Sequence, residues 1–480
     1  MTDRQTNHAR FLRAGLRQRL SAFVQKTFTT LEPGKPYAHN WHLDHLAWQL
    51  ARVERGEIRR LIINVPPRSG KSITVSVAFT AWLLGRDPTK RVIAVSYAED
   101  LARKLSLDTR RVMQSEWFTE LFPACELVRG RQRTMELTTT QQGGRFAAGV
   151  GGSVLGRGAD LIVIDDPIKA LDALSEAERR RVNEFYDNTL LTRLNDKQTG
   201  AIVLVMQRLH QSDLVGYVRA RGDWEVVSLP AIAVDDTTHR ISDDPDRVHV
   251  RRRDDLLHPE REPRAVLDEV RRGQGSMTFA AQYQQEPMPP GGNVIQRAWL
   301  RFYDEAPPEF DRLIASWDTA STLAKTSDWS VGTVWGAVGQ EFYLLDVLRD
   351  RLEAPALQHA IINLSADWQV GLTLIENTEL GRALAQHLFS SGRLRPKLNT
   401  VQRDKLARLL AVSARFEAGQ VLLPREAPWL ATYMSELLAF PNGDHDDQVD
   451  STSQALRHLT ERQRFATPRV ATVRRNIPRR

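Results

Sequence analysis

The feature that most constrains the fold is an apolar, strand-like run joined to an amphipathic helix by a short loop that contains Gly-Lys-Ser. Residues 61–72 read Leu-Ile-Ile-Asn-Val-Pro-Pro-Arg-Ser-Gly-Lys-Ser. In a strand, loop and helix of this kind, the backbone N–H groups of the loop and of the helix N-terminus converge on phosphate oxygens. We expect Lys71 to reach the terminal phosphates and Ser72 to offer its hydroxyl to Mg²⁺. The segment therefore predicts a nucleoside triphosphate site.

The loop departs from the pattern G-x-x-x-x-G-K-[ST] at its first position, which is Val65. Pro67, Arg68, Ser69 and Gly70 complete the loop and are predicted to contact the nucleotide. A lysine in a solvated turn is the alternative interpretation. The strand before the loop and the helix after it supply the context that phosphate binding requires, and they favour the nucleotide site.

A second apolar run, residues 161–164, ends in Asp165 and Asp166. A buried strand gains nothing by ending in paired like charges, so these acids point to chemistry. Asp165 is predicted to act through the Mg²⁺ shell, and Asp166 to polarise the attacking water. The shorter side chain of aspartate, where many such enzymes use glutamate, leaves the base assignment open. A turn formed by Asp-Asp-Pro is the alternative.

Two arginines are candidates for stabilising charge in the transition state of phosphoryl transfer. Arg157 lies in a glycine-rich segment, residues 151–158, and Arg68 lies inside the phosphate loop. The sequence does not choose between them, and either also fits an arginine on a flexible surface loop.

Polar and aromatic residues near these motifs are further candidates for nucleotide contacts. Gln207 follows the strand-like run 201–206 and could sense the γ-phosphate, although a polar cluster at a strand end explains it equally well. His42, next to Trp41, is a candidate for contact with the base, and so is Tyr37. A core tryptophan beside a surface histidine is the alternative.

Strand-like runs alternate with helical patterns through the N-terminal half, and this alternation predicts a parallel α/β sheet. The strand-like runs are residues 61–65, 91–96, 161–164, 201–206 and 226–229, and the helical patterns include 99–114 and 175–194. We predict an N-terminal helical segment at 1–36, an ATPase domain at 37–234, a linker or connector at 235–295, a second, different α/β domain at 296–460 and a basic, disordered tail at 461–480.

Composition limits the class of protein. The 480 residues include 41% hydrophobic residues but no apolar stretch long enough for a membrane span, and the N-terminus lacks a signal-peptide pattern, so we expect a soluble, cytoplasmic protein. The single cysteine, Cys125, can form no internal disulfide and excludes a cysteine-based zinc site. The net charge of +7 lies mostly in the tail, where seven arginines accompany one glutamate, so global charge does not itself indicate DNA binding.

Acidic residues are spread across the C-terminal half in a characteristic order. Three strand-like runs, 313–317, 330–338 and 341–347, are followed by a helix, a strand at 372–375 and further helices, and Gly339-Gln340 predicts a hairpin. Asp318 ends the first strand, Glu376 ends the fourth, and Asp447 and Asp450 share one face of the last helix. This is a ribonuclease H-like layout.

Such carboxylates, if they converge, cannot all stay ionised without cations between them. Pairs of Mg²⁺ or Mn²⁺ ions held by carboxylates are the machinery of phosphodiester hydrolysis, so the sequence predicts a metal-dependent nuclease. Helix caps and solvated surface acids are the alternative for each residue taken alone.

Taken together, the chain resembles the large terminase subunit of tailed bacteriophages over residues 37–458. The motifs that carry the resemblance are V-P-P-R-S-G-K-S, L-I-V-I-D-D-P, V-M-Q-R-L-H, W-D-T-A, I-E-N-T and H-D-D-Q-V-D. The resemblance implies an N-terminal ATPase of the ASCE type with a parallel sheet, a flexible linker and a ribonuclease H-like nuclease. It also implies ATP-driven translocation of double-stranded DNA into a procapsid and endonucleolytic cutting of concatemeric DNA.

Residue by residue, the resemblance assigns Lys71 and Ser72 to nucleotide and Mg²⁺, and Asp165 and Asp166 to the second ATPase motif. It assigns two divalent cations, Mg²⁺ or Mn²⁺, to Asp318, Glu376 and Asp447, with Asp450 as a fourth acid. The implied partners are DNA held through its backbone, a small terminase subunit and the portal of a procapsid, on which the chain forms a homo-oligomeric ring. The implied location is the cytoplasm of a bacterial host, not the mature virion.

Two other classes remain open on sequence grounds. One is a helicase- or repair-type ATPase-nuclease that acts on DNA without a capsid. The other is a nuclease-free packaging ATPase whose C-terminal acids are only structural.

Overall fold

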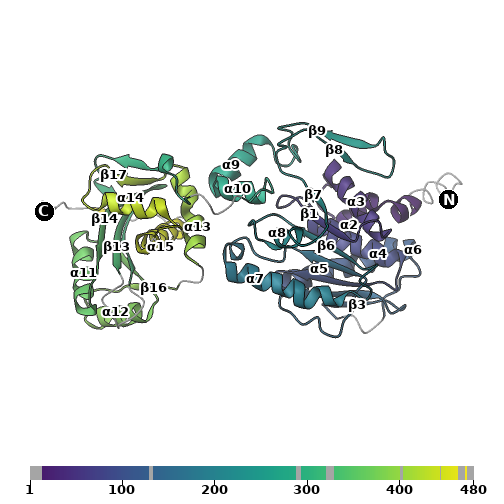
Figure 1. The fold of residues 1–480 in the computed structure, drawn as a ribbon, viewed down its shortest axis with the longest axis horizontal. Helices are drawn as coiled ribbons and strands as arrows, with labels where there is room; N and C mark the ends of the chain where they lie inside the picture. Colours follow the sequence, from purple (N-terminus) through teal and green to yellow (C-terminus); the bar gives the residue numbers. More distant parts are fainter. Residues whose placement is uncertain are drawn as a thin grey trace. The chain divides into compact units, whose positions relative to one another are not determined.

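The structure of the protein is a computed structural model, which describes residues 13–128, 133–287, 293–319, 329–400, 404–443, 445–462 and 471–472. The chain divides into two compact units. Unit 1 comprises Met1–Arg271 and Met277–Met288, and unit 2 comprises Arg272–Ser276 and Pro289–Arg480. Each hydrophobic core cluster lies inside one unit. Figure 1 colours unit 1 from purple to teal and unit 2 from green to yellow.

Unit 1 is built on a seven-stranded sheet with the order β3-β4-β2-β5-β6-β1-β7. Its strands are β1 (Arg60–Asn64), β2 (Arg91–Ser96), β3 (Glu136–Thr138), β4 (Gly144–Gly149), β5 (Leu161–Asp165), β6 (Ala201–Met206) and β7 (Glu225–Ser228). All neighbouring strands are parallel except β3 and β4. The predicted parallel α/β sheet is confirmed, with an antiparallel edge strand that the sequence pattern did not reveal.

The central strands are aliphatic because both of their faces are covered. Every residue of β5 and β6 is buried, as expected for parallel strands between two layers of helices. Neighbouring residues of β1 serve different cores: Leu61 and Ile63 pack in one cluster and Ile62 in the other. Because β1, β6 and β5 are parallel neighbours, their carboxyl ends meet at one edge of the sheet. Parallel α/β folds place their ligands at this edge.

The helices of unit 1 follow the predicted alternation, and several are short. They are α2 (Leu20–Leu31), α3 (Trp41–Glu54), the π-helix η1 (Ile73–Phe79), α4 (Thr80–Arg86), α5 (Glu99–Met113), α6 (Glu116–Leu121), η2 (Asp172–Leu174), α7 (Glu176–Phe185), η3 (Tyr186–Leu190), η4 (Leu191–Arg193) and α8 (Leu214–Arg219). The helical pattern predicted at 175–194 is therefore realised as α7 followed by one π and one 3₁₀ segment.

The predicted connector, residues 235–295, contains two strands and two helices. It holds β8 (Thr237–Arg240), β9 (Val248–Arg251), α9 (Arg264–Gln274) and α10 (Ser276–Gln282). Strands β8 and β9 form an antiparallel hairpin. Residues 235–271 and 277–287 belong to unit 1 by their contacts. The proposed domain boundaries themselves remain a proposal.

Unit 2 is built on a second seven-stranded sheet, with the order β10-β17-β14-β13-β12-β15-β16. Its strands are β10 (Arg301–Tyr303), β12 (Arg312–Asp318), β13 (Ser330–Val338), β14 (Glu341–Asp350), β15 (Leu372–Glu376), β16 (Lys397–Asn399) and β17 (Val421–Pro424). The hairpin predicted at Gly339-Gln340 is confirmed, because β13 and β14 are antiparallel neighbours. Strand β12 runs antiparallel to β13 and parallel to β15.

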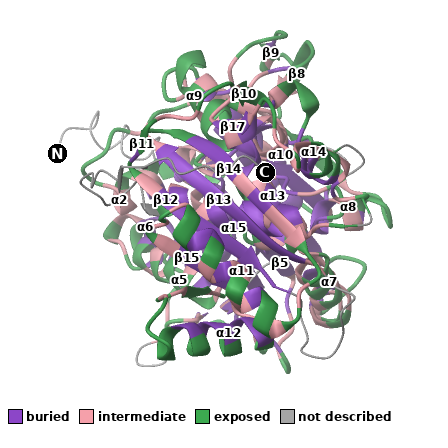
Figure 2. Cartoon of the chain, turned by 90° about the vertical axis from the view of Figure 1, so that its left-hand side faces the viewer, coloured by how far each residue is buried: buried purple, intermediate pink, exposed green. Residues whose placement is uncertain are grey.

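The helices of unit 2 cover this sheet, and its central strands β12, β13 and β14 are buried (Figure 2). The helical elements are η5 (Arg297–Trp299), α11 (Ala354–Asp367), α12 (Glu379–Ser390), α13 (Lys405–Glu417), α14 (Leu430–Ala439) and α15 (Asp447–Arg462). Helix α15 packs on β12 and β13, which brings its first turn to the end of β12 where Asp318 lies.

Two smaller observations complete the fold. Two residues of the basic tail form β18 (Ala471–Thr472), which pairs with β11 (Glu309–Phe310). The rest of the tail beyond α15 lies outside the described residues. Within the described part of the chain, every helix is too short or too polar to span a bilayer.

Candidate functional site

The loop between β1 and η1 is shaped by two residues with left-handed backbone conformations. Arg68 has a φ of 62° and Gly70 a φ of 81°; glycine adopts this region without the penalty that a Cβ imposes. The Ser69 hydroxyl donates to the carbonyl of Pro66 at 2.8 Å, and the N–H of Thr74 donates to the carbonyl of Gly70 at 3.0 Å. The loop is therefore ordered by its own hydrogen bonds.

Lys71 joins the ends of three strands. Its side chain is 6% exposed, and its Nζ lies 2.9 Å from Oδ1 of Asp166, beyond β5. The same Nζ donates to Oε1 of Gln207, beyond β6, at 2.8 Å. The structure thus brings together the predicted lysine, the second aspartate and the candidate phosphate sensor. An ammonium group held here is positioned to bind a polyphosphate.

The carboxylate of Asp165 is hydrogen-bonded to two serines that follow the phosphate loop. Its Oδ1 accepts a hydrogen bond from the Ser72 hydroxyl at 3.2 Å, and its Oδ2 accepts one from the Ser76 hydroxyl at 2.6 Å. Burial, and then the charge of Asp166, raises the pKa of Asp165 to about 6, although both serines and Lys71 favour the ionised form. The hydroxyl and carboxylate oxygens of Ser72 and Asp165 are ligands that suit Mg²⁺.

Asp166 has a backbone conformation that costs free energy. Its φ is 44°, a region that non-glycine residues seldom adopt. Two hydrogen bonds hold it there: its N–H donates to the carbonyl of Val205 at 2.9 Å, and its carbonyl accepts from the N–H of Tyr97 at 3.1 Å. Strain of this kind costs about 1–3 kcal/mol and is concentrated at functional sites. The conformation aims the carboxylate at Lys71.

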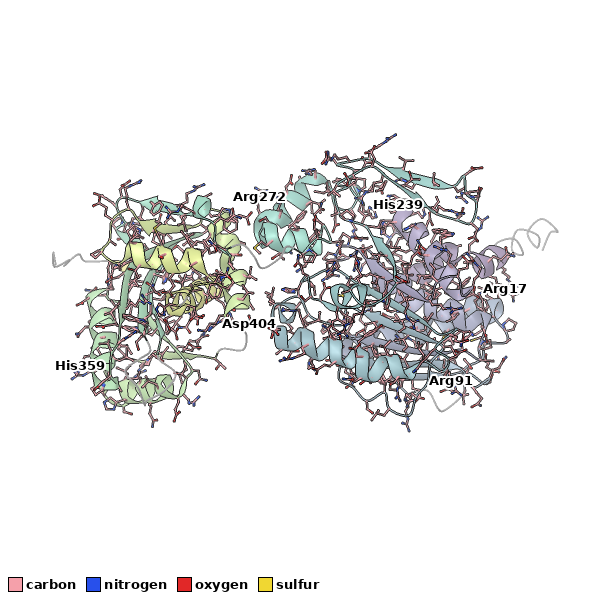
Figure 3. All side chains as sticks on the ribbon, viewed as in Figure 1. Arg17, Arg91, His239, Arg272, His359 and Asp404 are labelled. Carbon is pink, nitrogen blue, oxygen red and sulfur yellow. The ribbon has the colours of Figure 1, made fainter. Side chains whose placement is uncertain are left out.

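The residues predicted to contact the base are all engaged with the protein. Nε2 of His42 lies 3.0 Å from the carbonyl oxygen of Ser69, and burial lowers the pKa of His42 to about 4, so its ring is neutral at pH 7. The ring of Trp41 stacks on two histidines of the β8–β9 hairpin, His249 at 4.2 Å and His239 at 4.9 Å; His239 is labelled in Figure 3. Contact with the base remains a prediction.

Tyr37 packs against the ring of Phe28 at 5.4 Å, and burial raises the pKa of its phenol. Val65, which occupies the position of the missing first glycine, is fully buried in the core under the loop. A glycine there would remove apolar contacts, so packing accounts for this departure from the pattern.

The two candidate arginines lie in different places. Arg68 is exposed on the phosphate loop itself. Arg157 forms a two-point ion pair with Glu136 of β3, at 2.5 and 3.1 Å, and its guanidinium lies 3.9 Å from the ring centroid of Phe146 in β4. Strands β2, β5 and β6 separate β4 from β1, so the structure does not bring Arg157 to Lys71 within the chain.

Sequence reasoning missed one residue of this site and one buried charge elsewhere in unit 1. Ser76 was not singled out, although it shares Asp165 with Ser72. Arg145 in β4 is 1% exposed, and its Nε and Nη1 have no hydrogen-bond partner among the described residues. Burial lowers the pKa of Arg145 to about 10, while the charge of Asp165 opposes that shift. The sequence signal that could have revealed Arg145 is a single charge in the otherwise apolar strand Gly-Arg-Phe-Ala-Ala-Gly.

In unit 2 the four predicted carboxylates come together at one edge of the sheet. Trp317 pairs with Ile375, so the next residues, Asp318 and Glu376, are neighbours on β12 and β15. Burial, a hydrogen bond with Glu376 and the charge of Asp450 raise the pKa of Asp318 well above its usual value, with Asp447 adding to the effect.

Basic residues of α13 compensate part of this negative charge. Arg408 Nη2 lies 2.7 Å from Asp450 and its Nη1 lies 3.6 Å from Glu376, so one guanidinium bridges two of the acids. Lys405 Nζ lies 3.2 Å from Asp450. Burial still raises the pKa of Asp450 to about 6 against both cations. Helix α13 is fixed by its cap Asp404 (Figure 3), which accepts a hydrogen bond from the N–H of Ala407.

The start of α15 is held by a buried glutamate. Glu436 accepts hydrogen bonds from the backbone N–H and the side-chain amide of Gln448, each at 2.6 Å. Burial, followed by the charges of Glu436 and Asp446, raises the pKa of Asp447, whereas Lys405 and Arg349 oppose the rise. No spacing pattern in the sequence links Glu436, Lys405 or Arg408 to these acids, because they come from other helices.

The carboxylate cluster fits hard divalent cations by its chemistry. All four predicted ligands offer oxygen atoms, which Mg²⁺ and Mn²⁺ prefer. Burial is the main cause of the raised pKa values of Asp318 and Asp450, so a bound cation would favour their ionised forms. Across the described ranges, no group of three or more His, Cys, Asp or Glu side chains stands at metal-binding spacing. The guanidinium of Arg408 bridges two of the four acids, Glu376 and Asp450.

Comparison with known proteins bears on both units. Residues 315–459 match the family model of the terminase RNaseH-like domain. The large terminase of a thermophilic bacteriophage, in complex with ADP, has a TM-score of 0.52 and 9% identity, covering 86% of this chain and 98% of its own. The complex of that terminase with ATP-gamma-S has a TM-score of 0.50 and 10% identity, covering 85% and 98%. No curated protein matches the chain.

The resemblance to large terminase subunits is confirmed. Residues 315–459, which lie in unit 2, match the family model of the terminase RNaseH-like domain, and the chain has the fold of a large terminase. The predicted fold class, an α/β unit with a parallel sheet followed by a ribonuclease H-like α/β unit, is therefore confirmed as well.

Proposed function

We propose that this protein is a genome-packaging motor subunit of a tailed bacteriophage, which uses ATP hydrolysis to move double-stranded DNA into a procapsid and cuts concatemeric DNA with a metal-dependent endonuclease. The observation that carries the proposal is the presence of two separate polar sites at strand ends. One is centred on Lys71 in unit 1 and the other on Asp318 in unit 2, inside the matched terminase RNaseH-like domain.

In the ATPase half, Lys71 and the loop residues Pro67, Arg68, Ser69 and Gly70 bind the phosphates of ATP. Ser72 and Asp165 hold Mg²⁺, which supplies charge neutralisation for the phosphates. Asp166 orients the attacking water and accepts its proton. Gln207, whose side chain is hydrogen-bonded to Lys71, contacts the γ-phosphate. The similarity in fold to a terminase whose structures were solved in complex with ADP and with ATP-gamma-S supports nucleotide binding by this chain.

In the nuclease half, Asp318, Glu376, Asp447 and Asp450 hold two divalent cations, Mg²⁺ or Mn²⁺. Such a pair activates water and stabilises the leaving oxygen in phosphodiester hydrolysis. Neighbouring residues of unit 2 reduce the charge repulsion among these acids and hold them in place. Arg408 and Lys405 lower the repulsion among the acids, and Glu436 fixes the first turn of α15 from which Asp447 and Asp450 project.

The same proposal extends to partners and location. A motor that moves any genome contacts DNA through backbone phosphates, so its affinity falls steeply with salt. A small terminase subunit and the portal of a procapsid are the protein partners, and the portal supports a homo-oligomeric ring. These encounters take place in the cytoplasm of an infected or lysogenic bacterial host, and the protein is absent from the mature virion.

Two variants of the full chain test the division of labour. Lys71→Ala should lose ATP hydrolysis by about 100-fold or more, because a phosphate-binding charge is removed, yet retain Mn²⁺-dependent cutting of DNA. Asp318→Ala should do the reverse. Loss of both activities in both variants would sink the two-site assignment, and cutting that survives Asp318→Ala would identify a nuclease-free packaging ATPase. Stimulation of ATPase activity by branched DNA rather than by procapsids would favour a repair-type enzyme.

A further inference from the structure

Two arginines and a tryptophan lie beside the carboxylate cluster of unit 2, and the proposed function does not use them. The guanidinium of Arg349 lies 4.3 Å from the ring centroid of Trp329, and that of Arg351 lies 4.6 Å from the same centroid. Trp329 directly precedes β13, whereas Arg349 and Arg351 lie at the end of β14 and just after it. We call these three residues the Trp329 cluster.

Strand register places this cluster at the same edge as the acids. Asp318 pairs with Val331, and Val331 pairs with Arg349. Paired residues in neighbouring strands point to the same face of a sheet, so Asp318 and Arg349 share a face. Two inter-strand spacings, on the order of 10 Å, separate them. The charge of Arg349 also reaches Asp447, where it opposes the burial-driven rise in pKa.

Hydrogen bonding within the protein does not account for these guanidiniums. Nε and Nη2 of Arg349 are buried and have no hydrogen-bond partner among the described residues. Nη2 forms an ion pair with the carboxylate of Glu436 at 3.7 Å, which is too long for a hydrogen bond, and Glu436 also accepts two hydrogen bonds of 2.6 Å from Gln448. Arg351 is exposed.

Two guanidiniums on one aromatic ring repel each other, and this arrangement is favoured when an anion binds both. Arginine binds phosphate through paired N–H donors and stacks on aromatic rings more readily than lysine does. The anion expected next to a nuclease centre is a backbone phosphate of DNA. Phosphates repeat every ~3.4 Å of helix axis along a strand, so the separation from Asp318 corresponds to a few nucleotides.

We propose that Arg349 and Arg351, held on Trp329, bind backbone phosphates of the DNA strand next to the bond that is cut. This inference rests on the proposed nuclease function of the same unit. The contact is independent of base sequence because it reads only the phosphate. The arginines position the strand over the carboxylates and do not take part in the bond-breaking step.

The test uses the full chain, linear double-stranded DNA of two unrelated sequences, and Arg351→Gln as the main variant, since an exposed side chain can be replaced without disturbing the core. Binding is measured in EDTA, so that nothing is cut, over a range of salt concentrations. Each phosphate contact contributes about 0.9 to the slope of log affinity against log salt. We expect Arg351→Gln to lower that slope by about 1 and to weaken binding about tenfold for both sequences.

Arg395→Gln is the matched control, because Arg395 is also an exposed arginine over an aromatic ring of unit 2, 5.9 Å from Phe389 on α12. It should bind DNA like the parent. A second variant, Arg349→Lys, keeps the charge but loses the paired donors, and should weaken binding less than Arg349→Gln. In Mn²⁺, all Trp329-cluster variants should raise KM for cutting with kcat kept within about threefold, and ATP hydrolysis without DNA should be unchanged.

An unchanged salt slope in Arg351→Gln and Arg349→Gln would overturn the proposal, as would an equal loss in Arg395→Gln. A lower thermal stability with unchanged DNA affinity would assign the cluster a structural role only, which also overturns it. A parent protein that binds DNA but does not cut it contradicts the nuclease function alone, because the phosphate contacts are judged from binding.

Discussion

The two sites both lie at the ends of sheet strands, but the groups that they offer to a ligand have opposite charge. In unit 1 the chain supplies a buried cation, Lys71, and holds it with Asp166 and Gln207. In unit 2 the chain supplies four acids and compensates them with Arg408 and Lys405. The first arrangement suits a polyanion such as a triphosphate, and the second suits divalent cations.

The difference also appears in how each site is fixed. Around Lys71, the backbone itself is constrained: Arg68, Gly70 and Asp166 all have positive φ angles. The acids of unit 2 have no such strained residues among them in the described part of the chain, and helix packing positions them instead. A site for phosphates relies on backbone N–H groups whose direction must be well defined, whereas a site for cations relies on side chains that can adjust.

The largest effect should come from Asp165→Asn. The change preserves shape but removes the charge that binds Ser72 and Ser76 and that is proposed to hold Mg²⁺. We expect a loss of ATP hydrolysis of about 10²- to 10³-fold, measured by phosphate release, with DNA cutting retained. The control is Asp100→Asn on α5, whose carboxylate is 92% exposed. Retained hydrolysis in Asp165→Asn would contradict the Mg²⁺ assignment.

Divalent cations should stabilise unit 2 more than any single contact does. Mn²⁺ at about 100 times its dissociation constant should add roughly 2.7 kcal/mol to the free energy of opening, because it binds only the folded state and compensates carboxylates such as Asp318 and Asp450, whose pKa values burial raises. Hydrogen exchange of the α15 amides measures this. Asp318→Asn should lose most of the protection gained. Equal protection in the parent and in Asp318→Asn would place the cation elsewhere.

A pH dependence separates the acids of unit 2 from ordinary surface acids. The pKa of Asp450 is raised to about 6 in the folded state, above its value of about 3.9 in an unfolded chain. The folded state therefore takes up the proton first, and in EDTA this group's contribution to stability increases as pH falls from about 6 toward 4. We expect the opening equilibrium constant of α15, measured by hydrogen exchange, to fall by up to about tenfold per pH unit in this window.

The matched variant Asp450→Asn should lack this part of the pH dependence. In saturating Mn²⁺ the trend should reverse in the parent, because protons then compete with the cation for the carboxylates. A parent and an Asp450→Asn variant with the same pH profile in EDTA would show that Asp450 titrates normally.

The smallest effect is expected for Arg157→Gln. Its ion pair with Glu136 joins side chains that are 36% and 28% exposed, so its loss should cost less than about 1 kcal/mol of stability. ATP hydrolysis by the isolated chain should stay within a few-fold of the parent. Arg68→Gln, on the loop, is the comparison. A fall of about 10³-fold in Arg157→Gln would show that this arginine reaches the phosphates after all.

Most of the fold followed from local signals in the sequence. The runs that became β1, β2, β5, β6 and β7 were apolar and bounded by turn residues, so their pattern was sufficient. Strands β3 and β16 were missed because each has three residues, and β4 because Arg145 interrupts its apolar pattern. Short or mixed segments become strands only through their neighbours.

The candidate sites were predictable where a residue ends an apolar strand. Asp165, Asp318 and Glu376 all carry that signal. Arg408 and Arg349 do not, since they lie within regular elements and reach the acids only through the packing of α13 and the register of β14. Long-range pairing of this kind leaves no spacing pattern in one chain.

Each hydrophobic cluster of the protein lies within one unit. Substitutions that repack one core therefore leave the other intact, so the two halves can accumulate changes at different rates. Exchange of the entire C-terminal half between related genes would leave the sheet that carries Lys71 complete. The architecture would allow the unit that carries the carboxylate cluster to be exchanged by recombination while the unit that carries Lys71 is inherited unchanged.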